Sequence, residues 1–266
     1  MSEIKNFDTG IPIESGIKII NLDPKENILN KKKIRNILKK ISESNLDDLS
    51  HNIKNAYHEN AEIYAFHPVN ELKGVDEIID TLWKPLIYSF PDLERRDNLI
   101  IGGSFQNRVY VSTVGHLTGT FAHPWLGVPS NGKTIHLRIC EVHQIENEKI
   151  INSHILIDIM DFIRQAGFWP VNPSLGIEEM WPGPITGDGT TFENLDSNLS
   201  ATTLDQGLTM QRSLNIKPET EVGATKDTVR EKLINHPQKD YWHPKMMWHG
   251  PCGIGTARGL KGFVEH

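Results

Sequence analysis

The sequence of 266 residues lacks most of the features that would assign it to a specialised class. It has only two cysteines, Cys140 and Cys252, which cannot form a disulfide framework or complete a structural zinc site. No apolar run approaches the ~20 residues of a membrane span, and the first residues lack the charged-then-apolar pattern of a signal peptide. We therefore expect a cytoplasmic protein without a membrane partner.

The sequence also lacks an excess of positive charge. Its formal net charge is -6 and its pI about 6.1, which argues against a nucleic-acid partner bound through phosphate contacts. The basic stretch Lys31–Lys40 contains apolar residues at helical spacing and predicts the solvated face of a helix. A hydrophobic fraction of 38% is typical of a globular chain with a buried core.

Hydrophobic periodicity changes along the chain from helical to strand-like. Helical patterns cover Lys31–Ile41, Ser44–Tyr57 and a segment that Gly74 opens. From about Leu93 the period is two, and long strands are expected at Arg108–Thr118, Thr134–Glu146 and Lys149–Met160. Elements segregated in this way predict an α+β domain, with helices packed on one face of a curved, mainly antiparallel sheet.

Composition divides the chain into four parts. We expect an irregular segment at 1–24, the α+β domain at 25–170, a Pro- and Gly-rich arm or linker at 171–223, and a separate tail at 224–266.

The tail repeats the spacing of the start of the domain. His58 and Gly74 recur as His243 and Gly259, because 243 − 58 and 259 − 74 both equal 185. We interpret this as an internal duplication with an incomplete second copy, chance similarity being the alternative.

A set of short motifs resembles a known family. The motifs are Gly119-Thr120, Gly127-Val128-Pro129, Gly132-Lys133, Lys149-Ile150, Asp158 and Gln165-Ala166-Gly167. Together they resemble the SnoaL-like polyketide cyclases of the NTF2-like superfamily, and the resemblance extends over residues 31–167. It implies a cone-shaped α+β fold around an apolar pocket, no metal or cofactor, and ring closure by aldol condensation with an aspartate as acid and base. The tail also looks like part of longer SnoaL-like proteins with two such domains.

Asp158 is a candidate site residue even when the family resemblance is set aside. It lies in the apolar run Ile155–Met160, on the strand face that also carries His154 and Leu156. A carboxylate among apolar side chains has a raised pKa, which makes it a better base near neutral pH. The alternatives are a cap for the following short helix or the last solvated position of the strand. The resemblance implies the acid/base role for Asp158.

Three further polar residues are site candidates. Glu141 and His143 share one face of their strand, and we expect both to bind substrate. Glu141 could equally form an ion pair with an arginine such as Arg138 or Arg108. His116 is a second catalytic candidate that could polarise a substrate carbonyl, the alternative being a hydrogen-bonded core histidine.

Two residues are expected to shape the pocket and are assigned to substrate binding. His154 stands where the family usually has tryptophan, four positions before Asp158, so the pocket's shape and polarity should differ. Trp125 lies in a loop at the expected mouth of the pocket, where it either packs or stacks on a ligand.

Metal and phosphate sites are not indicated. His116, His123, His136 and His143 lack the spacing of a metal site, and Gly253–Gly255 lacks the lysine of a phosphate-binding loop. We therefore predict neither a metal nor a cofactor.

The sequence is interpreted as that of a cofactor-free cyclase or isomerase that acts on a polyketide-like or other small hydrophobic carbonyl compound. The alternative is a non-catalytic NTF2-like module for ligand binding or dimerisation. Apolar strand residues including Val109, Val111 and Leu137 need a cover, so we expect a homodimer or a cover supplied by the arm.

Overall fold

The computed structural model describes residues 23–169, 172, 176–178, 180–192, 196–213 and 223–265. These residues form two compact units. The first contains the described residues up to 172 together with 180–192, and the second contains 176–178 and the described residues from 196 onward. Within these ranges no helix is long and apolar enough to cross a membrane. The irregular segment predicted at 1–24 lies almost entirely outside the described residues.

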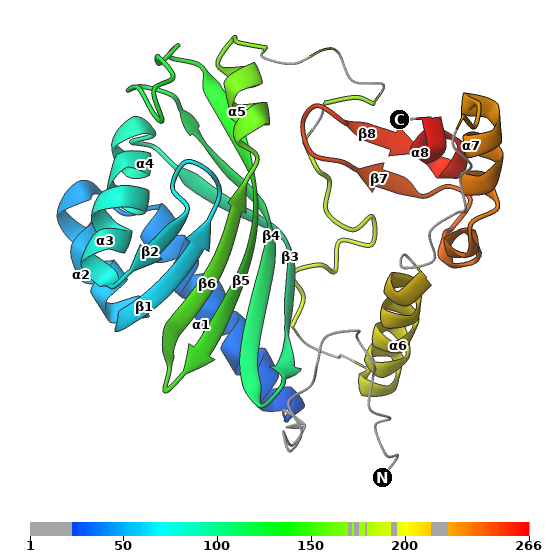
Figure 1. Ribbon diagram of the computed structural model, residues 1–266. Coiled ribbons are helices and arrows are strands. Elements are labelled where there is room, and N and C mark those ends of the chain that lie inside the picture. The colour runs from blue at the N-terminus through cyan, green and yellow to red at the C-terminus, as the bar shows by residue number, and fades with distance from the viewer. Residues whose placement is uncertain are drawn as a thin grey trace. The chain divides into compact units, whose positions relative to one another are not determined.

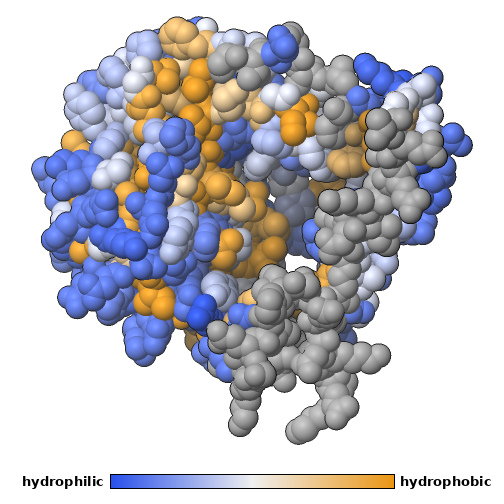
Figure 2. Space-filling view, viewed as in Figure 1, coloured by the Kyte–Doolittle hydropathy of each residue, from blue (hydrophilic) through white to orange (hydrophobic). Residues whose placement is uncertain are grey.

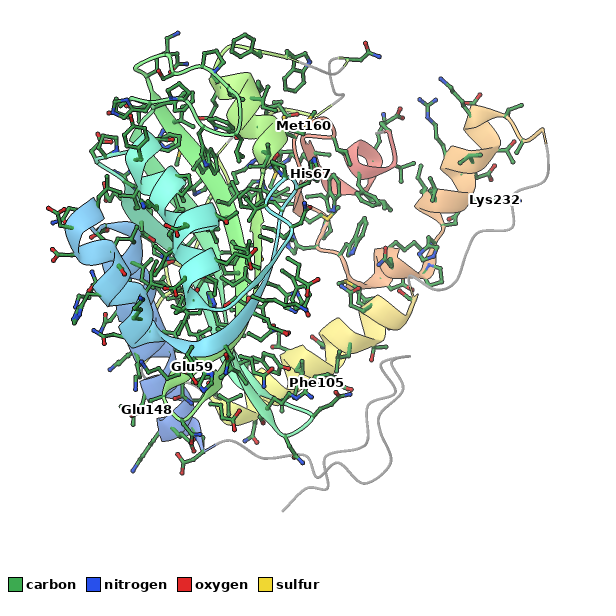
Figure 3. The ribbon with its side chains drawn as sticks, turned by 60° about the vertical axis from the view of Figure 1, so that its left-hand side comes forward. Glu59, His67, Phe105, Glu148, Met160 and Lys232 are labelled. Atoms are coloured by element: carbon green, nitrogen blue, oxygen red, sulfur yellow. The ribbon has the colours of Figure 1, made fainter. Side chains whose placement is uncertain are left out.

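The first unit contains a six-stranded sheet with the order β2-β1-β6-β5-β4-β3 (Figure 1). Its strands are β1 (Tyr57–Ala65), β2 (Glu71–Lys73), β3 (Glu94–Phe105), β4 (Arg108–Thr120), β5 (Thr134–Glu146) and β6 (Lys149–Ile157). Neighbouring strands are antiparallel except β1 and β6, which are parallel. His67 after β1 and Met160 after β6 therefore lie toward one end of the sheet, and Glu148 in the β5–β6 turn lies at the other (Figure 3).

Helices cover one face of this sheet (Figure 1). They are α1 (Pro24–Ser42), α2 (Leu46–Ala56), α3 (Val75–Glu77), the π-helix η1 (Ile78–Trp83) and α4 (Lys84–Ser89). The short helix α5 (Ile159–Gln165) follows the end of β6, and its Asp161 contacts Arg138 of the other face. Helix α1 begins where Asp23 accepts a hydrogen bond from the Lys25 backbone N–H, with Pro24 at the first helical position. Of the predicted apolar stripe, Ile34, Leu38 and Ile41 are fully buried and Ile37 is half-buried against the core.

The apolar face of β4 and β5 is covered by helices. Val111 and Leu137 are at most 1% exposed. Gly102, the β3 partner of Val111, faces α1, because a Cβ atom there would lie 2.3 Å from Asn27 Oδ1 and 2.8 Å from Lys31 Cγ. The expected cover by a partner or by the arm is therefore not needed for these residues. The predicted α+β class with a curved, mainly antiparallel sheet is confirmed.

Within the predicted arm at 171–223, residues 180–192 lie along β3, whereas Ser197–Ser213 form helix α6 of the second unit. The Ile100 N–H donates to the Gly189 carbonyl oxygen at 2.8 Å, and the Asn98 side-chain amide donates to the Trp181 carbonyl oxygen at 2.9 Å. Phe192 is buried, with Lys31 Nζ 5.4 Å from its ring centre. The segment thus pairs part of an edge strand that would otherwise expose backbone donors and acceptors.

The second unit is smaller. Its elements are α6 (Ser197–Ser213), α7 (Lys226–Ile234), the 3-10 helix η2 (Pro237–Tyr241), β7 (Met247–His249), β8 (Thr256–Arg258) and α8 (Gly259–Glu265). Strands β7 and β8 form a two-stranded antiparallel sheet. Phe263 packs edge-on against Trp242 and Trp248, with ring centres 4.6 and 5.2 Å away.

The hairpins of the two units share one register. Glu62 pairs with Lys73 in the β1–β2 hairpin, and Met247 pairs with Arg258 in the β7–β8 hairpin. Each residue of the second pair lies 185 positions after its counterpart, because 247 − 62 and 258 − 73 both equal 185. The following glycine donates across each hairpin at 2.8 Å, from Gly74 to Ala61 and from Gly259 to Met246. Both glycines have positive φ, 82° and 64°. This geometry agrees with the duplication that the sequence predicts, and the second copy stays a prediction.

Candidate functional site

The sheet separates the predicted site residues into two groups. Glu141, His143 and Trp125 lie on the side that the helices cover, whereas His116 and His154 point to the opposite face. Asp158 follows the end of β6 and contacts Arg138, a residue of that opposite face. The structure therefore does not bring Asp158 together with Glu141 and His143.

A group of buried polar side chains lies between the sheet and the helices. We call it the interior polar cluster, and it comprises Tyr57, Trp83, Arg95, Thr113, Glu141, His143 and Ser153. All seven are at most 5% exposed. They come from β1, η1, β3, β4, β5 and β6, so only the folded sheet with its helices brings them together.

An ion pair forms the centre of the interior polar cluster. Arg95 Nη2 donates to Glu141 Oε2 and, at 2.8 Å, to Thr113 Oγ1, which in turn donates to the same Glu141 oxygen at 2.8 Å. Arg95 Nε donates to Asp97 Oδ1 at 2.8 Å. Burial acts to raise the pKa of Glu141, but the positive charge of Arg95 and the neighbouring His143 outweigh it and hold that pKa well below its usual value. Glu141 is thus a buried carboxylate that stays ionised.

His143 extends the cluster toward β6 and β1. Its Nδ1 is hydrogen-bonded to Ser153 Oγ at 2.8 Å, and its Nε2 lies 3.9 Å from Glu141 Oε2. Burial, followed by the charge of Glu141, raises the pKa of Tyr57, so the Tyr57 hydroxyl keeps its proton at neutral pH.

Five buried atoms of the cluster have no well-aligned hydrogen-bond partner among the described residues. They are Tyr57 Oη, Trp83 Nε1, Arg95 Nη1, Glu141 Oε1 and His143 Nε2. Tyr57 nevertheless lies near enough to Trp83 and Ser153, and Glu141 to His143, for weaker hydrogen bonds that act to lower the pKa values of Tyr57 and Glu141. Buried polar atoms in native proteins are nearly always paired with protein, water or ligand. So many in one place distinguish this cluster from an ordinary structural ion pair.

Three hollows are described on the surface of the first unit. Their volumes are about 660, 220 and 370 Å³, and none is lined by a residue of the interior polar cluster. Trp83 is the largest fully buried side chain of the described residues. The structure thus places buried polar side chains within the otherwise apolar interior that the family resemblance implied.

A second polar group lies on the opposite face. We call it the outer-face cluster: His116, Arg138, Asp158, Asp161 and Trp181. Arg138 Nη2 lies 2.7 Å from Asp158 Oδ2, and its guanidinium lies over the Trp181 ring at 5.0 Å. His116 is the β4 partner of Arg138, and burial, with smaller effects from His136, Arg138 and Arg96, lowers the pKa of His116 to about 4.

Asp158 has two structural partners. One carboxylate oxygen binds Arg138, and the other accepts the Asp161 backbone N–H at 3.0 Å, which makes Asp158 the N-cap of α5. The expectation of purely apolar surroundings is wrong, because a buried arginine from β5 reaches this strand end. Met160, expected in the strand, lies in α5.

The remaining predicted residues make packing contacts. Trp125 is 3% exposed and packs edge-on against Phe66, Phe90 and Phe162, with the Phe162 ring centre 5.0 Å away. His154 is exposed and stacks on Tyr64 at 5.1 Å. Glu141 does form an ion pair, but with Arg95 instead of Arg138 or Arg108.

Sequence reasoning missed Tyr57, Trp83 and Arg95. The signal for Arg95 was present, since Arg95 and Asp97 stand at alternating positions of a strand pattern and so share one face. Tyr57 and Trp83 fall in apolar patterns that do not separate a core residue from a site residue.

The curved sheet with helices on one face places the first unit in the NTF2-like class of α+β domains. Residues 35–166 match the family model described as SnoaL-like polyketide cyclase. This part of the chain belongs to that family.

The chain is also similar to several solved structures. The chain is similar to a provisionally assigned SnoaL-like polyketide cyclase from Jannaschia sp. CCS1, with 16% identity, a TM-score of 0.45, and coverage of 59% of this chain and 98% of that one. It is also similar to IdmH, a provisionally assigned polyketide cyclase from Streptomyces antibioticus (15% identity, TM-score 0.44, coverage 52% and 99%). A third similar structure is a SnoaL-like polyketide cyclase from Agrobacterium tumefaciens str. C58, with 17% identity, a TM-score of 0.39, and coverage of 52% of this chain and 98% of that one. A search of the curated proteins found no match.

Proposed function

We propose that the SnoaL-like domain binds a small apolar carbonyl compound and moves a proton on it without a cofactor, as a cyclase or isomerase. Family membership supports a polyketide cyclase-like or ligand-binding role. The observation that carries the catalytic proposal is the buried pair of Glu141 and His143, in which His143 Nε2 lies 3.9 Å from Glu141 Oε2 and both side chains are 0% exposed.

This pair can perform the proton transfers of an aldol closure. His143 Nε2 takes a proton from the carbon next to a carbonyl, and Glu141 stabilises the resulting imidazolium. Tyr57, which keeps its proton, donates a hydrogen bond to the enolate oxygen. The enolate carbon then forms a bond to a second carbonyl carbon of the same molecule, and the alkoxide so formed takes the proton back from His143. No atom or electron is left over.

The sequence-based role of Asp158 is a competing proposal for the same reaction. In this proposal Asp158 acts as the acid and base, and His116 polarises the substrate carbonyl. The proposal is supported by the positions of the two residues, since Asp158 contacts Arg138 and His116 is the β4 partner of Arg138. Against it, both Asp158 oxygens already have structural partners. Its carboxylate is therefore better explained as a cap and an ion-pair partner.

A second candidate function is a non-catalytic binding or dimerisation module. It is favoured by hydrophobic side chains that reach the surface of the sheet, among them Leu156 at 62% and Ile101 at 58% exposure. Figure 2 shows hydrophobic residues at the surface of this unit. Such a face fits a homodimer, which equilibrium sedimentation would detect.

The test compares variants on a panel of polyketide esters and cyclic enones. His143→Gln should lower turnover by about 10²–10⁴, the usual effect of losing a general base, while Asp158→Asn should keep most of it. The reverse order would support Asp158 and overturn the assignment to the interior polar cluster. Saturable binding without turnover by the unmodified protein would support the binding module.

A further inference from the structure

The segment 180–192 docks where β3 is irregular. The register between β3 and β4 shifts between Asp97 and Leu99, so Asn98 is an extra residue that forms a β-bulge. Bulges bend a strand and redirect the side chains beside them, and they occur often next to functional sites. The side chain beside this bulge is that of Asp97, which accepts a hydrogen bond from Arg95 of the interior polar cluster.

The backbone of the bulge is packed closely from two sides by glycines. On β4, a Cβ atom at Gly115 would lie 2.2 Å from the Arg96 carbonyl oxygen. On the other side, a Cβ atom at Gly189 would lie 2.1 Å from the Asn98 carbonyl oxygen. A side chain at either position would displace the backbone, so this close approach requires glycine. The Asn98 side-chain amide also donates to the Trp181 carbonyl oxygen at 2.9 Å, so the segment holds both the backbone and the side chain of Asn98.

The end of the segment contacts the same ion-pair network. The Phe192 ring is 8% exposed, and the Arg35 guanidinium lies over it at 5.9 Å. Arg35 Nε lies 3.5 Å from Asp97 Oδ2, while Arg95 Nε donates to Asp97 Oδ1 at 2.8 Å. Arg95 in turn donates to Glu141. A continuous series of contacts therefore connects the segment to the buried carboxylate of Glu141.

We propose that residues 180–192 are a clasp that positions Arg95 against Glu141 by holding the β3 bulge and Asp97. The interior polar cluster is complete only while the clasp is docked, so the site depends on residues beyond the 35–166 of the family match. The chain on both sides of the clasp belongs to the second unit, so the clasp connects that unit covalently to the bulge. The inference rests on the proposed function only for the role of the cluster as a site.

Gly189→Ala tests the clasp in the full-length protein, because the added methyl group displaces the segment from Asn98. Nitrogen-15 NMR would measure two proton-exchange rates. One is that of the Ile100 amide, which donates to the Gly189 carbonyl oxygen, and the other is that of the Arg95 Nε–H, which donates to Asp97. We expect both rates to rise at least tenfold, while the amides of β6 keep theirs. A segment that merely covers the strand edge would not change the Arg95 rate.

Gly103→Ala is the matched control. It adds the same methyl group to β3 itself, at a position where a Cβ atom meets no described atom within 4 Å, so both rates should stay unchanged. Phe192→Ala is a milder variant that removes only the contact with Arg35, and it serves if Gly189→Ala does not fold. In this variant the Arg95 rate should again rise at least tenfold.

Three results would overturn the proposal: an unchanged Arg95 rate in Gly189→Ala, an equal rise in Gly103→Ala, or a rise that extends equally to β6. These exchange rates do not depend on turnover. Full activity of His143→Gln would therefore refute the catalytic proposal and leave the clasp in place, whereas an unchanged Arg95 rate would refute the clasp and leave catalysis by His143 untouched.

Discussion

Replacing Arg95 by methionine should destabilise the first unit strongly. The side chain is 1% exposed and is the positively charged partner of Glu141, which is 0% exposed. Arg95→Met keeps most of the apolar stem and removes the guanidinium with its bonds to Glu141, Thr113 and Asp97. Glu141 then remains as a buried carboxylate without its countercharge.

The expected loss is about 3–5 kcal/mol in the free energy of unfolding, the usual cost of breaking a buried ion pair from one side. The neighbour Arg96 supplies the scale for comparison. Its side chain is 52% exposed and pairs with Glu94 at 3.0 Å, so Arg96→Met should leave the free energy of unfolding nearly unchanged. The two substitutions are chemically identical and adjacent on one strand.

Urea unfolding followed by circular dichroism would measure both variants. The double variant Arg95→Met/Glu141→Met is the decisive addition, because it removes both charges and leaves apolar side chains of similar volume. It should recover most of the stability lost in Arg95→Met. Equal effects of Arg95→Met and Arg96→Met, or a double variant less stable than both single ones, would refute the buried-pair reasoning.

Three further predictions concern other parts of the chain. The pKa of His116 is lowered to about 4 in the folded protein, whereas an unfolded chain protonates this histidine near pH 6.5. The free energy of unfolding should therefore decrease as the pH falls from about 6.5 to about 4. His116→Gln should flatten this pH dependence, as measured by urea unfolding at several pH values. Asp158→Ala should cost about 2 kcal/mol or more, measured by thermal unfolding, because it removes a helix cap and the partner of Arg138, and an unchanged midpoint would contradict that role. Gly74→Ala and Gly259→Ala should each cost about 1–2 kcal/mol because of positive φ, and faster amide exchange in each hairpin would show it.

The sequence determined most of the secondary structure of the first unit. The apolar stripe of α1 and the alternation along β4, β5 and β6 predicted those elements, because helices and strands impose periods of 3.6 and 2. The motif set that ends at Gly167 also identified the family, since residues 35–166 match its model. Local patterns were sufficient for both conclusions.

The candidate site was only partly predictable. The alternation of residues along β5 correctly placed Glu141 and His143 on one face of the sheet. It could not show that the helices cover this face, or that the sheet face carrying His154 is exposed at that residue. The alternatives for Asp158 included a helix cap, which the structure shows, but no local signal indicated its bond to Arg138.

Only the tertiary structure decided which charges meet. Arg95 and Glu141 are 46 positions apart in the chain, and Trp83 enters from a helix that the sheet pairing does not specify. Periodicity records which residues share a face, whereas the packing of sheet against helix selects the face that becomes buried. The pKa of Glu141 depends on that burial and on the distant Arg95, so its chemistry arises from contacts that sequence spacing does not encode.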